Sequence, residues 1–247
     1  MMPSVYNQST PITFDDHVLT DYFLLSDLSL PLPSFAPTTR DVAGMDGVLF
    51  ADNRMQQLEI SMTISVWDLP IDDRRELIGM LWGWLQVDEP KPLQIGDAPY
   101  WLVVPAQCGE LEHYINADAV SLRFLACDPV RYGEEKTATI PSGGSVQIEV
   151  EGTYPAYLTI EADAAVRGTS NLWGVRVDSG DYSRVSLPTA SATAVTIDAA
   201  SRTASISGDP AMITLTSDWL RVDPGEHTLA MDVGTGAATV TWVERWL

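Results

Sequence analysis

The stretch MQQLEISMTISVWD, residues 55–68, decides the fold of the first half of the chain. Apolar side chains stand at every second position along it: Leu58, Ile60, Met62, Ile64 and Val66. A period of two is typical of a strand that buries one face, since successive side chains point to opposite sides of a sheet. The stretch VSLRFLACDP, residues 120–129, alternates in the same way. The first half is therefore predicted to be built on β-sheets.

One helix is predicted in this half, over DDRRELIGMLWGWLQV, residues 72–87. Apolar residues recur at helical spacing and share one face: Leu77, Met80, Leu81, Trp84 and Leu85. Asp73, followed three residues later by Glu76, predicts a capping box at the helix start. Gly79 and Gly83 fall on the opposite face. The pattern thus indicates an α+β N-terminal domain with a single helix.

Trp82 is the one large apolar residue of this helix that the predicted buried face does not cover. One interpretation is ordinary partial burial. The other is contact with a neighbouring subunit, because aromatic residues are enriched in the cores of interfaces. Both interpretations stay open at this point.

The stretch TTRDVAGMDGVLF, residues 38–50, raises the question of a ligand loop, because Gly44 and Gly47 bracket Asp46. A calcium loop requires further oxygen ligands at regular spacing, and a phosphate loop leads into a helix. Apolar, strand-like residues follow here instead. The stretch therefore predicts a structural turn, in which glycine permits positive φ and aspartate bonds its own backbone.

The second half contains about nine short apolar runs separated by turn signals such as SGG, SGD and DPGE, with no helical pattern. This pattern of short strands and turns predicts an antiparallel β-sandwich of the jelly-roll or galectin-like type. The charged, glycine-containing stretch RYGEEKTATIPSGGS marks the change of composition. We expect an N-terminal domain over residues 1–133 and a C-terminal β-sandwich domain over residues 134–247.

The net charge of −20, from 34 acidic and 14 basic residues, argues against a protein that grips nucleic acid. Two cysteines, Cys108 and Cys127, are too few for a disulfide framework and are predicted to be buried hydrophobes. The N-terminus has neither the basic nor the apolar region of a signal peptide, and no apolar run reaches membrane-spanning length. The chain is expected to be soluble, without membrane insertion, and made in a reducing cytoplasm.

Known catalytic, metal and nucleotide motifs do not occur in the sequence. The three histidines, His17, His113 and His227, lie in separate segments without a catalytic partner nearby in sequence. No catalytic, cofactor-binding or metal-binding residue is therefore predicted, and the protein is expected not to be an enzyme.

The order of several motifs resembles the distal tail protein family of long-tailed, siphovirus-type bacteriophages. These motifs are ITFDDHVLTDYFLLSDL, RDVAGMDGVLF, the helix ending in Trp84 and Leu85, GDAPYW (96–101), CDPVRYG (127–133) and GTYPAYLTI (152–160). The segment LRVDPGEHTLAMDV (220–233) is similar to the family's closing motif, with His227 where the family often has Asn.

The resemblance implies a structural virion protein at the tail tip, assembled in the host cytoplasm. Six N-terminal domains would form a ring, and the C-terminal sandwiches would project outward. One face of the ring would dock on the tail tube protein and the other on the tail-tip hub or baseplate. DNA would pass through the channel without specific binding. The split of the charge, about −12 for residues 1–133 and −8 for the rest, agrees with an acidic channel that does not retain DNA.

An alternative function is a glycan-binding β-sandwich that recognises a host receptor. Its candidate contacts are Trp173 and Trp219, which would stack on sugars. Burial of both rings in the sandwich core is the favoured interpretation, because aromatic side chains contribute heavily to cores.

Overall fold

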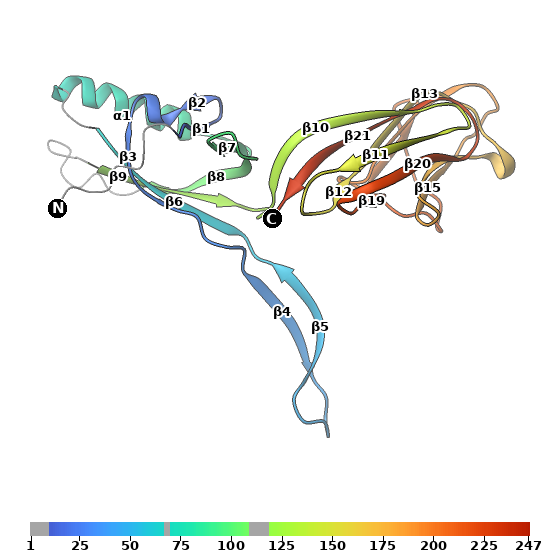
Figure 1. Ribbon diagram of the computed structural model, residues 1–247, viewed down its shortest axis with the longest axis horizontal. Coiled ribbons are helices and arrows are strands. Elements are labelled where there is room, and N and C mark those ends of the chain that lie inside the picture. Colours follow the sequence, from blue (N-terminus) through green and yellow to red (C-terminus); the bar gives the residue numbers. More distant parts are fainter. Residues whose placement is uncertain (1–9, 67–69, 109–118) are drawn as a thin grey trace. The chain divides into compact units, whose positions relative to one another are not determined.

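The structure is a computed structural model that describes residues 10–66, 70–108 and 119–247 (Figure 1). The chain divides into two compact units, Met1–Tyr132 with Leu247 and Gly133–Trp246. The division lies one residue before the expected boundary. Most described residues form strands, and among them there is one α-helix, so the predicted mainly β fold is confirmed.

Unit 1 is centred on a seven-stranded antiparallel sheet with the order β2-β1-β7-β8-β9-β6-β3. Its strands are β1 (Ile12–Phe14), β2 (His17–Val18), β3 (Leu24–Ser29), β6 (Leu58–Ser65), β7 (Lys91–Ile95), β8 (Trp101–Cys108) and β9 (Ala119–Ala126). A 3₁₀ turn, η1 (Leu19–Asp21), follows β2. The first two strands form the short N-terminal hairpin whose sequence carries part of the family resemblance.

Strand β6 occupies an inner position in this sheet, between β9 and β3. It pairs with β9 over its whole length, from Leu58 opposite Ala126 to Ser65 opposite Ala119. The apolar set of β6 is buried, as its alternation predicts, whereas Glu59 is exposed. The alternation therefore sets which face of the sheet meets the core.

Helix α1 (Ile71–Leu85) covers this core with Leu81 and Leu85, which are buried, and with Leu77 and Trp84, which are half-buried. The predicted capping box is wrong. The N-cap is Pro70, and no side chain caps the helix, so Asp73 already lies inside the first turn. There its negative charge is stabilised by the positive end of the helix dipole. Its side chain does not accept a hydrogen bond from the terminal N–H groups.

Between β3 and β6 the chain extends into a separate two-stranded sheet, β4 (Phe35–Asp41) and β5 (Val48–Met55). We call this ribbon, with its connecting turn, the arm. Figure 1 draws its two strands without a third beside them.

Unit 2 is a two-layer β-sandwich in which neighbouring strands such as β11 and β20, or β13 and β16, pair antiparallel. Its larger sheet has the order β10-β21-β13-β16-β17-β18, with β10 (Arg131–Ile140), β13 (Thr159–Ala165), β16 (Thr193–Asp198), β17 (Thr203–Ile206), β18 (Asp209–Ala211) and β21 (Ala238–Trp246). The smaller sheet has the order β11-β20-β14-β15, with β11 (Ser145–Val150), β14 (Leu172–Val177), β15 (Tyr182–Ser186) and β20 (Gly225–Val233). A short pair, β12 (Ala156–Tyr157) with β19 (Arg221–Val222), and a 3₁₀ turn, η2 (Thr169–Asn171), complete the unit.

The core of unit 2 contains side chains from both of its main sheets, among them Trp173 from β14 and Val240 from β21, each fully buried. The fold of this unit agrees with the predicted sandwich. Its short strands hold together because each sheet buries one apolar face against the other.

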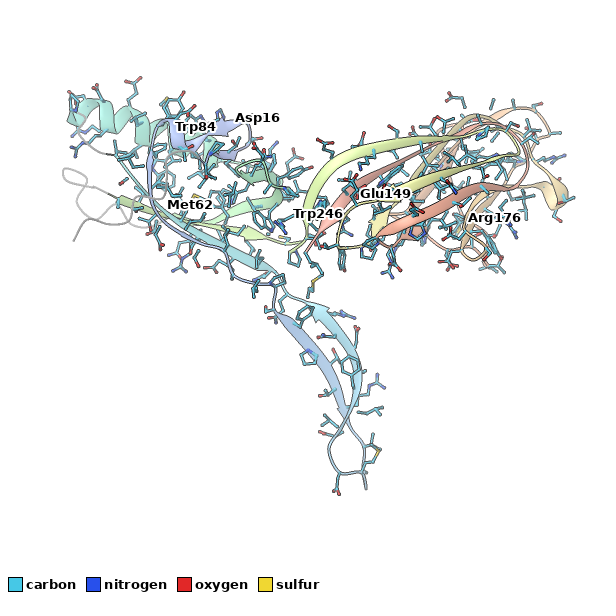
Figure 2. All side chains as sticks on the ribbon, in the orientation of Figure 1. Asp16, Met62, Trp84, Glu149, Arg176 and Trp246 are labelled. Carbon is cyan, nitrogen blue, oxygen red and sulfur yellow. The ribbon has the colours of Figure 1, made fainter. Side chains whose placement is uncertain are left out.

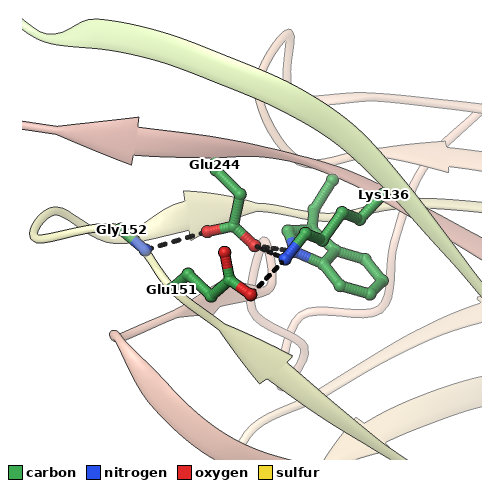
Figure 3. A network of polar contacts seen from close by, with 5 residues as sticks. Lys136, Glu151, Gly152 and Glu244 are labelled. Atoms are coloured by element: carbon green, nitrogen blue, oxygen red, sulfur yellow. Dashed lines mark hydrogen bonds and ion pairs between the residues drawn. The ribbon is translucent and has the colours of Figure 1, made fainter. Parts of the chain in front are cut away.

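Unit 2 also contains a buried carboxylate with several polar contacts (Figure 3). Glu244, on β21, is only 2% exposed. Its Oε2 accepts the backbone N–H of Gly152 at 2.9 Å, and its Oε1 lies 3.6 Å from Lys136 Nζ. Lys136 also pairs with Glu151 at 2.9 Å. Burial of this charge is offset by the neighbouring ammonium and by hydrogen-bond donors.

The prediction that both cysteines are buried is wrong for Cys127, which is exposed. The residue follows the last position of β9, where the chain leaves the sheet, so strand burial no longer applies to it. The side chain of Cys108 lies outside what the structure describes.

Candidate assembly surfaces

The sequence TTRDVAGMDGVLF forms the end of β4, the arm's connecting turn and the start of β5. Gly44 and Gly47 have φ values of +84° and +85°, which side chains other than glycine rarely adopt. The turn thus has the backbone conformation that the glycines were expected to permit. Asp46 between them is exposed. The effect of this turn on assembly stays a prediction.

The arm is an amphipathic ribbon. Phe35 pairs with Met55, Thr39 with Phe50 and Asp41 with Val48, and paired residues of an antiparallel ribbon project from the same face. Alternation along β4 therefore places most of the large apolar side chains on one face. We call Phe35, Pro37, Val48, Phe50 and Met55 the apolar arm face.

The apolar arm face is open to solvent in the single chain. Phe50 is 63% exposed, Val48 55% and Phe35 54%. Figure 2 draws the side chains along the ribbon, and the two strands form a sheet of their own. A lone two-stranded ribbon is at best marginally stable in water, and contiguous exposed apolar surface marks an interaction site.

A second exposed surface lies on α1, opposite its buried side. Trp82 is 43% exposed there. This exposure agrees with both interpretations of the residue, partial burial in the chain and contact with another subunit. Trp84, labelled in Figure 2, is directed differently: its ring stacks on His17 at 4.4 Å between ring centres. We call Asp72, Arg75, Glu76, Gly79, Trp82 and Gly83, all exposed, the outer helix face.

The two tryptophans considered for glycan contact belong to the sandwich core. Trp173 is fully buried and offers no ring face to a sugar, so this candidate contact is wrong. Its strand, β14, is an inner strand of the smaller sheet, and the ring is enclosed between the layers. Trp219 is half-buried and packs against the same core.

Two histidines have defined surroundings, and His113 lies outside the described residues. In unit 2, His227 Nδ1 lies 2.8 Å from Asp178 Oδ2, and its Nε2 lies 2.8 Å from the carbonyl oxygen of Asp223. The Thr228 backbone N–H, together with His227, lowers the pKa of Asp178. These contacts join a strand, β20, to the turn after β14.

A recess of about 290 Å³ lies beside His227, lined by residues of β11 and β20 that are polar except for Ile148. Across the described ranges, no group of three or more His, Cys, Asp or Glu residues is placed to hold a metal ion. No helix in the same ranges is long and apolar enough to cross a membrane.

Comparison with known proteins agrees with this two-unit plan. Residues 151–246 match the family model of the siphovirus-type tail component, C-terminal domain. Across both units, the chain is 23% identical over 248 residues to the distal tail protein of Bacillus phage SPP1, covering 95% of this chain and 94% of that relative. The resemblance to the distal tail protein family of siphovirus-type bacteriophages is thereby confirmed.

Solved structures show the same fold. The crystal structure of Dit from phage SPP1, described as a paradigm of hub adsorption apparatus in phages that infect Gram-positive hosts, gives a TM-score of 0.75 at 21% identity, covering 96% of this chain and 99% of that one. A chain of the phage p2 baseplate in its activated conformation gives 0.54 at 9% identity, covering 94% and 97%. The chain therefore shares the β-rich fold of these phage tail proteins over both of its units.

Proposed function

We propose that the protein is a distal tail connector. Six copies form a closed ring at the tip of the tail, between the tail tube protein and the tail-tip hub or tail-associated protein. The N-terminal units form the ring, and the C-terminal sandwiches lie outside it. The protein acts through assembly, without catalysis, and is built into virions in the host cytoplasm.

The observation that carries this proposal is the extent of the match to the SPP1 distal tail protein. It spans 95% of this chain and 94% of the relative, so both units and their order are shared. A function that depends on the whole architecture transfers more securely on such a match than on one domain alone.

The arm gives independent support for assembly. Its apolar face has no cover within the described part of the chain, although exposure of these side chains to water is unfavourable. A neighbouring molecule that covers them would stabilise the arm. A ring of identical subunits offers such a neighbour to every copy.

The charge distribution supports DNA passage through the ring without specific binding. The net charge of about −12 over residues 1–133 means that a channel lined by this unit repels the phosphate backbone. Substitution of channel-facing acidic residues by lysine, chosen from an image of the ring, is expected to reduce DNA ejection. Unchanged infectivity of such phage would contradict the proposed channel.

Electron microscopy of the purified protein tests the connector directly. Averaged images are expected to show a six-fold ring with a central channel. Images of isolated particles without rotational symmetry, both for the protein alone and after addition of tail tube protein, would overturn the proposal.

A further inference from the structure

We propose that the apolar arm face of one copy seats on the outer helix face of the next copy in the ring. This inference rests on the proposed ring and names the two surfaces that form its interface. Because the surfaces differ, the interface is heterologous, and repetition of it around an axis closes a ring.

The arm requires a cover that its own chain does not supply. Phe35, Val48 and Phe50 are each more than half exposed on a ribbon that has no second layer. Aromatic side chains such as these dominate interface energies when a partner encloses them.

Charge favours a second copy of this chain as that cover. The arm, residues 35–55, carries two arginines and three aspartates, a net charge of −1 within a chain of net charge −20. Two such acidic chains repel each other over most of their surfaces. Contact through a nearly neutral arm brings two copies together with little of this repulsion.

The outer helix face has features that packing within the chain does not explain. Gly79 and Gly83 flank Trp82, and a Cβ added at either glycine would meet no atom within 4 Å. Each glycine costs a helix interior about 0.5–1 kcal/mol relative to alanine. Without side chains at these positions, another backbone can approach the helix closely beside the exposed Trp82 ring.

The two surfaces also match in length. Helix α1 has 15 residues and spans about 22 Å at a rise of about 1.5 Å per residue. Strand β5 has 8 residues and spans about 26 Å at a rise of about 3.3 Å per residue. The ribbon is therefore long enough to lie along the whole helix, and in the proposed seat Phe50 lies beside Trp82.

Gly79→Leu tests this seat without endangering the fold. Leucine is a better helix former than glycine and has open space at this position, so the isolated chain stays folded. The added side chain blocks approach of the arm, and we expect ring affinity, measured by sedimentation, to fall by about tenfold or more. Asp73→Leu, which adds an exposed leucine to another side of the same helix, is the matched control and leaves the ring intact.

Truncation of the two aromatic anchors tests their pairing. Trp82→Ala and Phe50→Ala are each expected to weaken the ring by about tenfold or more, and the double variant by much less than the product of the two effects. Met212→Ala, at an 87% exposed position of unit 2, serves as control. Independent, multiplicative effects would contradict contact between the two residues.

Cross-linking then separates this inference from the proposed function. Thr39→Cys, beside Phe50 on the ribbon, and Gln86→Cys, one helical turn after Trp82, are combined with Cys108→Ser and Cys127→Ser, and the chain is treated with a short bis-maleimide. A covalent ladder up to six chains is expected. Normal rings without cross-linked chains would overturn the arm-to-helix seat and leave the connector standing. An unsubstituted chain that forms no ring would overturn both.

Discussion

The indole Nε1 of Trp242 donates a hydrogen bond of 3.0 Å to Oε1 of Glu244, and both side chains are buried. The two residues lie two positions apart on β21, so they share one face of the strand. The carboxylate thereby ties the sandwich core to the segment around Gly152. Its position makes it a sensitive point for the stability of unit 2.

Glu244→Ala is expected to lower the free energy of unfolding by about 3 kcal/mol, because it leaves the buried donors of Gly152 and Trp242 without their acceptor. Glu151→Gln is the matched control: Glu151 also contacts Lys136, but its side chain is 57% exposed. The control is expected to cost less than about 1 kcal/mol. Urea titrations followed by tryptophan fluorescence measure both values, and equal losses would contradict the role of burial.

Gly174→Ala is expected to prevent stable folding of unit 2. A Cβ at this position would overlap the backbone carbonyl oxygen of Ser183 on the paired strand. Gly180→Ala is the control, since no atom lies within 4 Å of its added Cβ, and it should change stability by less than about 0.5 kcal/mol. Circular dichroism melts compare the two. A native melting temperature for Gly174→Ala would show that β14 and β15 do not approach as described.

Asp178→Asn tests a pH-dependent contribution to stability. The Thr228 N–H and His227 lower the pKa of Asp178 below 3.8, so this carboxylate stabilises the fold above that pH and loses its effect as the pH falls through the lowered pKa. Because the side chain is about half exposed, we expect the variant to be less stable by under about 1 kcal/mol near pH 5. Unfolding titrations near pH 5 and near pH 2.5 should show a smaller difference at the lower pH.

Gly47→Val is expected to impair ring closure. A β-branched residue is strained at a φ of +85° by about 1–3 kcal/mol, although the space around the position is open. Because the arm is separate from the core of unit 1, the melting of that unit should barely change. Gly47→Asn, which tolerates this conformation better, is the control. Normal rings formed by Gly47→Val would refute the assigned role of the turn.

Local patterns in the sequence predict much of this fold. The alternation of β6 and the helical spacing around Leu81 identify their elements, because each reflects one buried face. The start of α1 was harder to predict, since Pro70 begins the helix before the expected aspartate.

Long-range partners explain the features that the sequence did not predict. The buried position of Glu244 depends on Gly152 and Lys136, each about a hundred residues away along the chain. Val48, Leu49 and Phe50 have the composition of a buried strand, and only the structure places them on an uncovered arm. Local sequence does not record which surface a subunit leaves for its neighbour.

Native mass spectrometry of the purified chain tests the central claim most directly. The connector predicts one dominant species with the mass of six 27.0 kDa chains, weakened by Gly79→Leu and unaffected by Asp73→Leu. A 27.0 kDa monomer at every protein concentration, unchanged by addition of tail tube protein, would contradict the account.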